Sequence, residues 1–315
     1  MHKKDIEAGI FGLVVGDALG VPVEFRSRAA LAKDPVYDLR EYGTHRQPKG
    51  TWSDDSSLTF CLMESLVNGY DLEDIGLKFL QWKNEGYWTP HGSVFDIGMA
   101  TRQAITEFSK GTKSELCGGF DEYSNGNGSL MRILPMAFFL FNELDIDKRY
   151  DKVKAVSSLT HAHFRSVFAC FFYVELAIAL LRLRDKEKAL KETQETVFEY
   201  CYLRGFNMHE LDLYHRVLKG NIGMAEMEDI RSSGYVLDSL EASLWAFMAN
   251  DSYKSVVLDA VNLGEDTDTI GAIAGGLAGL YYGFDNQFDF WRMQMARYEA
   301  IEALINRFAN SLKVV

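Results

Sequence analysis

The sequence predicts an all-α protein that folds as a single compact domain of many helices over residues 1–315. Only 5 of its 315 residues are proline, and the last of them is Pro135, so residues that break helices are rare. Apolar residues recur at helical spacing along most of the chain, and no run alternates convincingly between polar and apolar residues as a strand would. The length alone would allow about two domains, but no repeat or low-complexity linker marks a boundary.

The first expected helix carries its apolar residues on one stripe. These residues are Ile6, Ile10, Leu13 and Val14. Asp17 falls on the same stripe near the C-terminal end, where neither burial nor the helix dipole favours a negative charge. It therefore needs a cation or a strong hydrogen-bond donor, and the simpler interpretation is a capping or loop hydrogen bond.

The remaining elements follow from the same periodicity. Residues 26–52 combine scattered charges with two prolines and two glycines and are expected to form a loop. A helix is then expected to start at Ser53, and a glycine- and asparagine-rich loop is expected at 118–128. Further helices are predicted over residues 71–83, 97–108, 130–141, 151–160, 163–184, 186–203, 208–218, 235–249, 252–262, 269–282 and 288–311.

The predicted helix at 269–282 is rich in glycine, because Gly271, Gly275 and Gly279 recur every four residues. A glycine inside a helix costs ~1 kcal/mol relative to alanine. Several together are expected only where neighbouring backbones must approach closely. We therefore predict a central, tightly surrounded helix whose N-terminus is held rigidly in the middle of the protein.

Charge and hydropathy argue against several classes of partner. The formal net charge is −12, from 33 basic and 45 acidic residues, so neither general nucleic-acid binding nor docking on a membrane is expected. Charged residues interrupt the N-terminal apolar run, which is interpreted as a mature helix and not a signal peptide. The apolar run at 167–181 contains Glu175 and is interpreted as too short to span a bilayer.

The four cysteines form no Cys-x-x-Cys pair. Cys61 and Cys170 lie in apolar helical stretches, where buried free thiols are expected. Zinc and disulfides are therefore not expected, and a cytoplasmic location fits this pattern.

Two short acidic motifs stand at predicted helix starts. They are Ser53-Asp54-Asp55-Ser56 and Asp266-Thr267-Asp268-Thr269. Either motif alone is most simply a helix cap. If both helix starts meet inside the protein, four carboxylates share a small space, where two like charges ~4 Å apart repel by about 4 kcal/mol at an effective dielectric of 20. Hard oxygen ligands favour magnesium, manganese or calcium, and two such ions would balance these charges.

Two further acidic residues are candidates with a simpler alternative. Glu24 follows the first helix beside Pro22, and taken alone it is more typical of a solvated loop residue. Asp96-Ile97-Gly98 is typical of a helix start with a capping aspartate.

A glycine-rich segment and a histidine pair complete the candidates. Gly126-Asn127-Gly128 and the nearby Ser124 precede a predicted helix. Backbone N–H groups there either bind an anion or belong to an ordinary flexible loop. His161 and His163 are close enough for a metal pair, but capping or core roles fit them better because no third ligand stands at suitable spacing.

Taken in order, these motifs resemble the ADP-ribosylglycohydrolases, a family that includes the hydrolase that reactivates ADP-ribosylated dinitrogenase reductase. The serine at Ser53 departs from the threonine that is usual in the family, although a serine hydroxyl can still ligate a hard cation. The matching pieces span residues 6–283 and are Gly16-Asp17-Ala18-Leu19-Gly20, Pro22, Glu24, Trp52-Ser53-Asp54-Asp55, Asp96-Ile97-Gly98, Gly126-Asn127-Gly128-Ser129-Leu130-Met131-Arg132, Pro135, Thr160-His161, Gly234-Tyr235-Val236 and Asp266-Thr267-Asp268-Thr269-Ile270-Gly271.

The resemblance implies an all-α fold with two divalent cations, Mg²⁺ or Mn²⁺. Glu24 matches a family glutamate that has a catalytic or gating role, and Asp96 matches a position suited to receive a guanidinium, which favours arginine-linked substrates. The implied metal ligands are Ser53, Asp54, Asp55, Asp266, Asp268 and Thr269. The implied substrate contacts are Asp96, Gly98, Ser124, Asn127, Gly128, His161 and Tyr235.

The expected function is therefore hydrolysis of ADP-ribose from arginine on a modified protein by a two-metal mechanism, with Asp55 or Glu24 as the catalytic base. One alternative is a hydrolase of another ADP-ribose linkage, such as serine, a nucleobase or a free metabolite. The other is a structural or ligand-binding protein of the same fold without enzymatic activity. The expected partner is an ADP-ribosylated protein or a small molecule that contains ADP-ribose.

Overall fold

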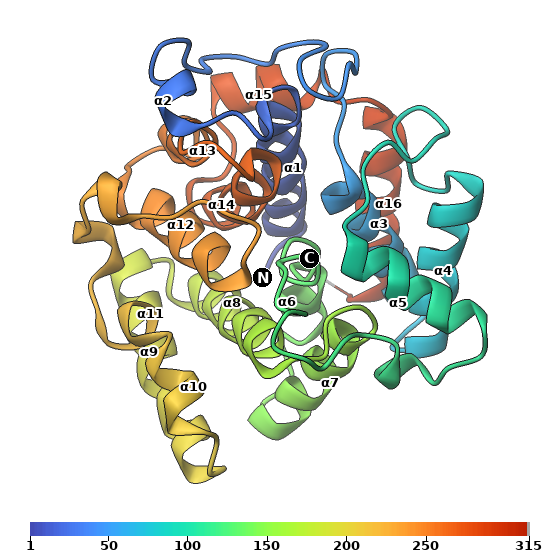
Figure 1. The fold of residues 1–315 in the computed structure, drawn as a ribbon, viewed down its shortest axis with the longest axis vertical. Helices are drawn as coiled ribbons and strands as arrows, with labels where there is room; N and C mark the ends of the chain where they lie inside the picture. Colours follow the sequence, from blue (N-terminus) through green and yellow to red (C-terminus); the bar gives the residue numbers. More distant parts are fainter. Residues whose placement is uncertain (314–315) are drawn as a thin grey trace.

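The computed structural model describes residues 1–313, and this part of the chain contains sixteen α-helices and no β-strand (Figure 1). The prediction of an all-α fold is confirmed. The helices are α1 (Lys3–Gly20), α2 (Arg28–Leu31), α3 (Asp54–Leu66), α4 (Leu72–Glu85), α5 (Met99–Ser109), α6 (Pro135–Phe139), α7 (Ile146–Ser158), α8 (Phe164–Leu183), α9 (Lys186–Leu203), α10 (Met208–Asp212), α11 (His215–Lys219), α12 (Val236–Ala249), α13 (Tyr253–Asn262), α14 (Thr267–Tyr282), α15 (Asn286–Arg292) and α16 (Tyr298–Ser311). Short 3₁₀ turns are η1 (Val21–Val23), η2 (Ser114–Leu116), η3 (Ile222–Met224) and η4 (Met227–Asp229).

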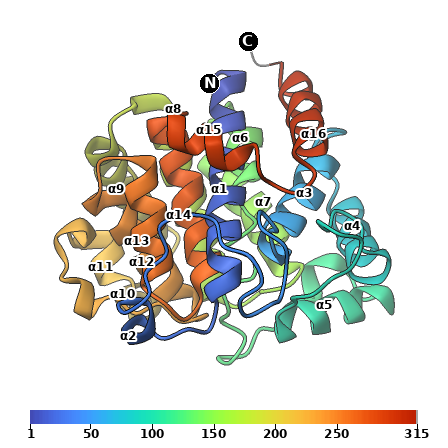
Figure 2. The same ribbon diagram turned by 90° about the horizontal axis from the view of Figure 1, so that it is seen from above.

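The other helices surround a central pair, α1 and α14. In Figure 1, α9, α12 and α13 lie to one side of this pair, and α3, α4, α5 and α16 lie to the other. The N-terminal end of α1 and the C-terminal end of α16 lie on the same side of the molecule, and the loop that follows α1 lies on the opposite side (Figure 2). The C-terminal end of α1 therefore points toward the side of the molecule where the long loops gather.

The two central helices touch through their backbones. A Cβ atom built on Gly16 would lie 1.9 Å from the carbonyl oxygen of Gly271, and one built on Gly12 would lie 2.4 Å from the carbonyl oxygen of Gly275. Because the partner number rises as the α1 number falls, the helices are antiparallel. The predicted close approach around this glycine-rich helix is confirmed, and its partner is a matching glycine face on α1.

The antiparallel contact fixes the start of α14 against the end of α1. A Cβ atom on Gly20 would lie 2.3 Å from the backbone nitrogen of Asp268, and the Thr267 hydroxyl donates a hydrogen bond to the Gly20 carbonyl oxygen at 2.8 Å. Both Thr267 and Asp268 are buried. The N-terminus of α14 is therefore held inside the protein, as predicted.

Three predicted helices are shorter or interrupted in the structure. The segment 130–141 contains only α6, because Pro135 starts a new helix and its ring nitrogen cannot donate to the preceding turn. The segment 288–311 is divided into α15 and α16 at Arg297, whose φ of 57° is left-handed. The segment 208–218 is divided into α10 and α11 at Tyr214, which lies outside helical geometry.

The expected loop at 26–52 contains one short helix, and one predicted helix starts earlier than expected. Ser27 caps α2 by accepting a hydrogen bond from the backbone N–H of Ala30. Likewise Asp145 caps α7, so that this helix begins at Ile146 and not at residue 151. Capping by a serine or an aspartate explains both starts.

Two helices have the length and composition of a membrane span. The first is Lys3–Val23, which comprises α1 and η1, and the second is α8, Phe164–Leu183. The most apolar window of each is 94% and 89% buried inside the described protein, respectively. The prediction that the second run is too short was wrong, because α8 extends over 20 residues, but packing in the core accounts for the composition of both.

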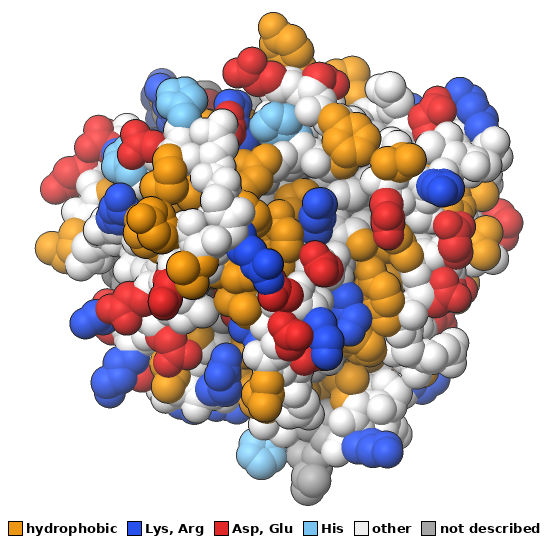
Figure 3. Space-filling model, turned by 90° about the horizontal axis from the view of Figure 1, so that it is seen from below, with side chains coloured by type: hydrophobic (Ala, Val, Ile, Leu, Met, Phe, Trp, Pro, Cys, Tyr) orange, Lys and Arg blue, Asp and Glu red, His pale blue; other side chains and the backbone are white. Residues whose placement is uncertain are grey.

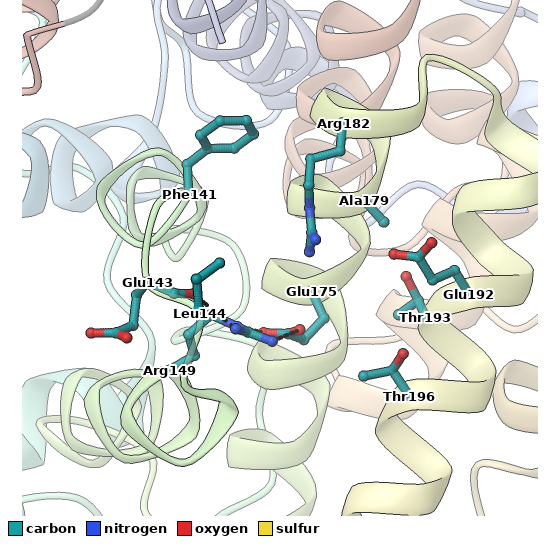
Figure 4. Close-up of a pocket in the computed structure, with 10 residues that line it drawn as sticks. All are labelled: Phe141, Glu143, Leu144, Arg149, Glu175, Ala179, Arg182, Glu192, Thr193 and Thr196. Atoms are coloured by element: carbon teal, nitrogen blue, oxygen red, sulfur yellow. Dashed lines mark hydrogen bonds and ion pairs between the residues drawn. The ribbon is translucent and has the colours of Figure 1, made fainter.

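The acidic residue within α8, Glu175, forms a buried ion pair. Glu175 receives two hydrogen bonds from the Arg149 guanidinium, at 2.6 and 2.8 Å. Both side chains line a hollow of about 210 Å³ between α7, α8 and α9 (Figure 4). On the face shown in Figure 3, acidic and basic side chains are interspersed and hydrophobic side chains gather near the centre.

A pair of alanine substitutions in α1 tests the backbone contact. Gly16→Ala places a methyl group on the Gly271 backbone, whereas Gly9→Ala meets the end of the Leu280 side chain, which can move. We expect Gly16→Ala to lower the free energy of unfolding by at least about 2 kcal/mol, despite a gain of ~1 kcal/mol in helix propensity. Gly9→Ala is the matched control and should cost less than about 1 kcal/mol. Equal losses in urea denaturation would contradict the proposed close contact.

Candidate active site

The carboxylate of Asp17 joins the end of α1 to the start of α3. It accepts hydrogen bonds from the backbone N–H of Ser53 at 2.9 Å and of Ser56 at 3.1 Å, and from the Ser56 hydroxyl at 2.5 Å. Asp17 therefore caps a neighbouring helix, which is the simpler of the two predicted roles. Burial raises its pKa to about 7, although these hydrogen bonds act in the opposite direction.

The same arrangement brings the two acidic motifs together, although more than 200 residues separate them in sequence. The Thr269 hydroxyl at the start of α14 lies 3.5 Å from Asp55 Oδ2 at the start of α3. The Ser53 hydroxyl donates to the same Asp55 oxygen at 3.0 Å. Asp54, Asp55 and Asp268 are all buried. The start of α3 and the start of α14 therefore share one interior space.

Glu24 completes this acidic cluster. It lies just after η1 and is 6% exposed, so the interpretation as a solvated loop residue is wrong. One carboxylate oxygen from each of Glu24, Asp266 and Asp268 lies within 4.8 Å of the others. The backbone N–H of Phe25 donates to the carbonyl oxygen of Glu265 at 2.7 Å, which ties the segment after α1 to the segment before α14.

Burial and mutual repulsion make these carboxylates hard to ionise. Burial, and then the neighbouring carboxylates, raise the pKa of Asp54, Asp55 and Asp268 well above the usual range for aspartate. Burial also raises the pKa of Glu24 to about 7. Several negative charges in one buried space are therefore electrostatically unfavourable, and nearby cations would reduce this free-energy cost.

The donor set fits a hard divalent cation. Asp55 Oδ1 and Asp268 Oδ2 are buried and have no hydrogen-bond partner among the described residues. Unpartnered buried carboxylate oxygens are costly in a stable fold and call for an explanation such as an ion. All the oxygens come from carboxylates and hydroxyls, which suit Mg²⁺ or Mn²⁺ better than soft metals.

Beside the acidic cluster, the Gly126–Gly128 segment presents free backbone donors. Within residues 1–313, the N–H groups of Gly128, Ser129 and Leu130 donate to no protein acceptor. Gly98 starts α5 without a side-chain cap, so this helix also begins with open N–H groups. A Cβ on Gly128 would lie 3.0 Å from the hydroxyl of Thr101 in the first turn of α5. The turn that follows Asn127 and the start of α5 therefore lie together, and their open N–H groups form a place suited to an anion.

Asn127 and Ser124 hold this segment in place through their side chains. The Asn127 amide donates to Asp266 Oδ2 at 2.7 Å and to the Ser239 hydroxyl at 2.8 Å. The Ser124 hydroxyl donates to Asp121 at 2.8 Å. Asn127 thus connects the Gly126–Gly128 segment directly to the acidic cluster, and its amide nitrogen already donates to protein acceptors.

His161 and Tyr235 flank the Gly126–Gly128 segment. His161 is 2% exposed and lies beneath this segment, where a Cβ on Gly128 would be 2.8 Å from its Cε1. Burial lowers the pKa of His161 to about 3, so the ring is neutral. Tyr235 is half-buried and pairs through its backbone with Gly126. His163 caps α8, so both histidines have the capping or core roles that the sequence favoured.

Asp96, in the segment before α5, lies next to the acidic cluster. Asp54 and Asp96 line the same small pocket, and Asp96 is half-buried. One oxygen each of Glu24 and Asp96 and one ring nitrogen of His45 lie within 4.8 Å of one another. Sequence reasoning missed His45, because it stands in a loop without periodicity and only the folded chain brings it to Glu24.

Comparison with known proteins identifies the family. The sequence profile of the ADP-ribosylglycohydrolase family matches residues 2–314. ADP-ribosylarginine hydrolase Tri1 from Serratia proteamaculans is 32% identical over 304 residues, which cover 95% of this chain and 77% of that protein. An ADP-ribosyl-dinitrogen reductase glycohydrolase from Rhodospirillum rubrum is 29% identical, with 92% and 90% covered. A solved structure titled ADP-ribosylglycohydrolase-related protein complex has a TM-score of 0.79 and 30% identity, and covers 99% of both chains.

The fold and the site define a helical protein built around a buried acidic centre, with the Gly126–Gly128 segment beside it. The match of nearly the whole chain makes the assignment specific: the chain belongs to the ADP-ribosylglycohydrolase family. The predicted resemblance is confirmed, and membership in a family of glycohydrolases favours an enzyme over a purely structural protein.

Neutralising one carboxylate tests whether the cluster holds cations. Asp268→Asn removes one negative charge from the crowded interior, so we expect the metal-free variant to unfold at the same or a higher temperature than the parent. Mn²⁺ binding should weaken at least about tenfold, and the rise in Tm on adding Mn²⁺ should shrink accordingly. Asp285→Asn, at the start of α15, is the control and should keep the response of the parent. An unchanged Mn²⁺ titration of Asp268→Asn would contradict the assignment.

Proposed function

We propose that this protein hydrolyses the bond between ADP-ribose and an arginine side chain of a modified protein, with two divalent cations at the acidic cluster. The main support is the pair of unpartnered buried oxygens, Asp55 Oδ1 and Asp268 Oδ2, on helix starts that meet. The relatives named ADP-ribosylarginine hydrolase, from Serratia proteamaculans and Pseudomonas putida at 32% and 31% identity, support the arginine linkage.

The proposed ligands surround the space between α3 and α14. When bound, Mg²⁺ or Mn²⁺ would supply an activated water and a positive charge that orients the ribose hydroxyls. Residues that would hold the ions are Ser53, Asp54, Asp55, Asp266, Asp268 and Thr269.

Glu24 and Asp55 are the candidates for the catalytic base. Each is buried, and burial raises the pKa of each carboxyl group, so each carboxylate is a stronger proton acceptor than an exposed one. The surrounding carboxylates also stabilise the positive charge that develops on the ribose as the glycosidic bond breaks.

The substrate would extend from the acidic cluster in two directions. The diphosphate would lie on the free N–H groups of Gly128, Ser129 and Leu130 and at the open start of α5. Tyr235 would line the same part of the site, with His161 supporting the segment from below. The guanidinium of the target arginine would lie toward Asp96, whose carboxylate can receive it in a bidentate arrangement.

We also propose that the protein acts in the cytoplasm on ADP-ribosylated proteins or on small molecules that contain ADP-ribose. All four cysteines are free and buried, which is compatible with a reducing compartment. The net charge of −12 disfavours a nucleic-acid partner or an anionic membrane.

A panel of linkages tests the proposed substrate. With Mg²⁺ or Mn²⁺ present, we expect release of ADP-ribose from arginine-linked protein at a kcat/KM at least about tenfold above serine-linked or nucleobase-linked substrates, a difference of 1.4 kcal/mol. EDTA should abolish turnover. Preference for a serine linkage would replace the proposed substrate with the alternative, and no turnover of any linkage would overturn the enzymatic proposal.

The role of Asp96 gives a second, residue-specific test. Asp96→Asn removes the charge that pairs with the guanidinium, so we expect kcat/KM for the arginine linkage to fall by about 10- to 100-fold, while any residual O-linked activity falls much less. Asp251→Asn, at a fully exposed aspartate, is the control and should match the parent. Equal losses on both linkages would show that Asp96 does not recognise the leaving group.

A further inference from the structure

The loop of residues 42–47 closes back onto the segment that follows α1. Its ends pair through a hydrogen bond from the Tyr42 backbone N–H to the Gln47 carbonyl oxygen at 2.6 Å. Gly43, with a φ of 53°, packs so closely that a Cβ would lie 1.9 Å from the Pro22 carbonyl oxygen. A residue with a side chain would force this loop away, so the close contact is built into the sequence at Gly43.

Three contacts from this loop reach Glu24 and the nearby Pro22. The Thr44 backbone N–H donates to the Pro22 carbonyl oxygen at 3.0 Å, and the Thr44 hydroxyl donates to the Glu24 carbonyl oxygen at 2.7 Å. The His45 Nε2 atom contacts Glu24 Oε2 directly. The loop therefore holds Glu24 by its backbone and by its carboxylate at the same time.

The His45 ring has two aromatic neighbours. The rings of Phe25 and Phe95 lie near it, with centroid separations of 6.0 and 5.3 Å. Its side chain is 12% exposed, and that of Glu24 is 7% exposed. Because both side chains are largely buried and in direct contact, the position of the His45 ring and that of the Glu24 carboxylate depend on each other.

We propose that His45 is a positioning residue for Glu24, and that residues 42–47 act as a clamp that keeps this carboxylate at the acidic cluster. The cluster gives a physical reason for the clamp. The carboxylates of Asp96, Asp266 and Asp268 repel Glu24, and the contact with His45 opposes this repulsion. The inference rests on the proposed function, in which Glu24 acts next to the reacting bond.

Kinetics of two His45 variants separate positioning from a general structural role. We expect His45→Ala to lower kcat for ADP-ribosylated arginine by about 100-fold with KM changed less than about threefold, because the carboxylate and not the substrate loses its place. His45→Gln keeps an N–H donor of similar reach and should recover at least about a third of the parent kcat. His215→Ala, at an exposed histidine on α11, is the control. Activity of His45→Ala within about twofold of the parent, or no recovery by the Gln variant, would overturn the proposal.

Two measurements without turnover make the test independent of the proposed function. Calorimetric titration with Mn²⁺ should give His45→Ala the same number of bound ions as the parent, and loss of one ion would make His45 a metal ligand and overturn the positioning role. Hydrogen exchange of the peptide around residues 20–27 should be faster in His45→Ala and in Thr44→Val, and unchanged in His215→Ala. Unchanged exchange in both variants would overturn the clamp even if the parent hydrolysed no ADP-ribose linkage.

Discussion

The backbone contact between α1 and α14 is the constraint on which the rest of the structure depends. Glycine faces allow the two helices to lie nearer than any side chain permits, from Gly12 and Gly275 to Gly16 and Gly271. This contact ends at Gly20, which packs against the backbone of Asp268. The acidic start of α14 is therefore placed by main-chain contact, whose tolerance is a fraction of an ångström, and not by adaptable side-chain packing.

Hydrogen bonds from neighbouring segments help the protein to tolerate its acidic centre. Several buried carboxylates with raised pKa values oppose folding unless cations or protons neutralise them. Two of these carboxylates are stabilised by hydrogen bonds: Asp17 accepts from the start of α3, and Asp266 accepts from the Asn127 amide. Among the described residues, Asp55 Oδ1 and Asp268 Oδ2 are the fully buried carboxylate oxygens without a hydrogen-bond partner. Both belong to the helix starts that meet at the acidic cluster, and local strain of this kind is common at functional sites.

The helical content and the residue types of the site could be predicted from the sequence, whereas the contacts between distant residues could not. The glycines of α14 indicated a close helix partner, but spacing did not point to α1: Gly16 and Gly20 stood only within a family motif, and Gly12 was not singled out. Glu24 looked solvated by local statistics, because its burial comes from residues 42–47 and 265, which periodicity does not place. His45 carries no local signal, since a histidine in a charged loop is ordinary until the chain folds.

The physical basis of the site also separates what can vary from what cannot. Among the proposed ligands, Ser53 stands where the family usually has threonine, so this position admits more than one hydroxyl side chain. The glycine contact admits no such exchange, because a methyl group at Gly16 would fall on the Gly271 carbonyl oxygen. The start of α14, which carries Asp268, is therefore positioned by the packing of its backbone against α1 and not by the carboxylates themselves.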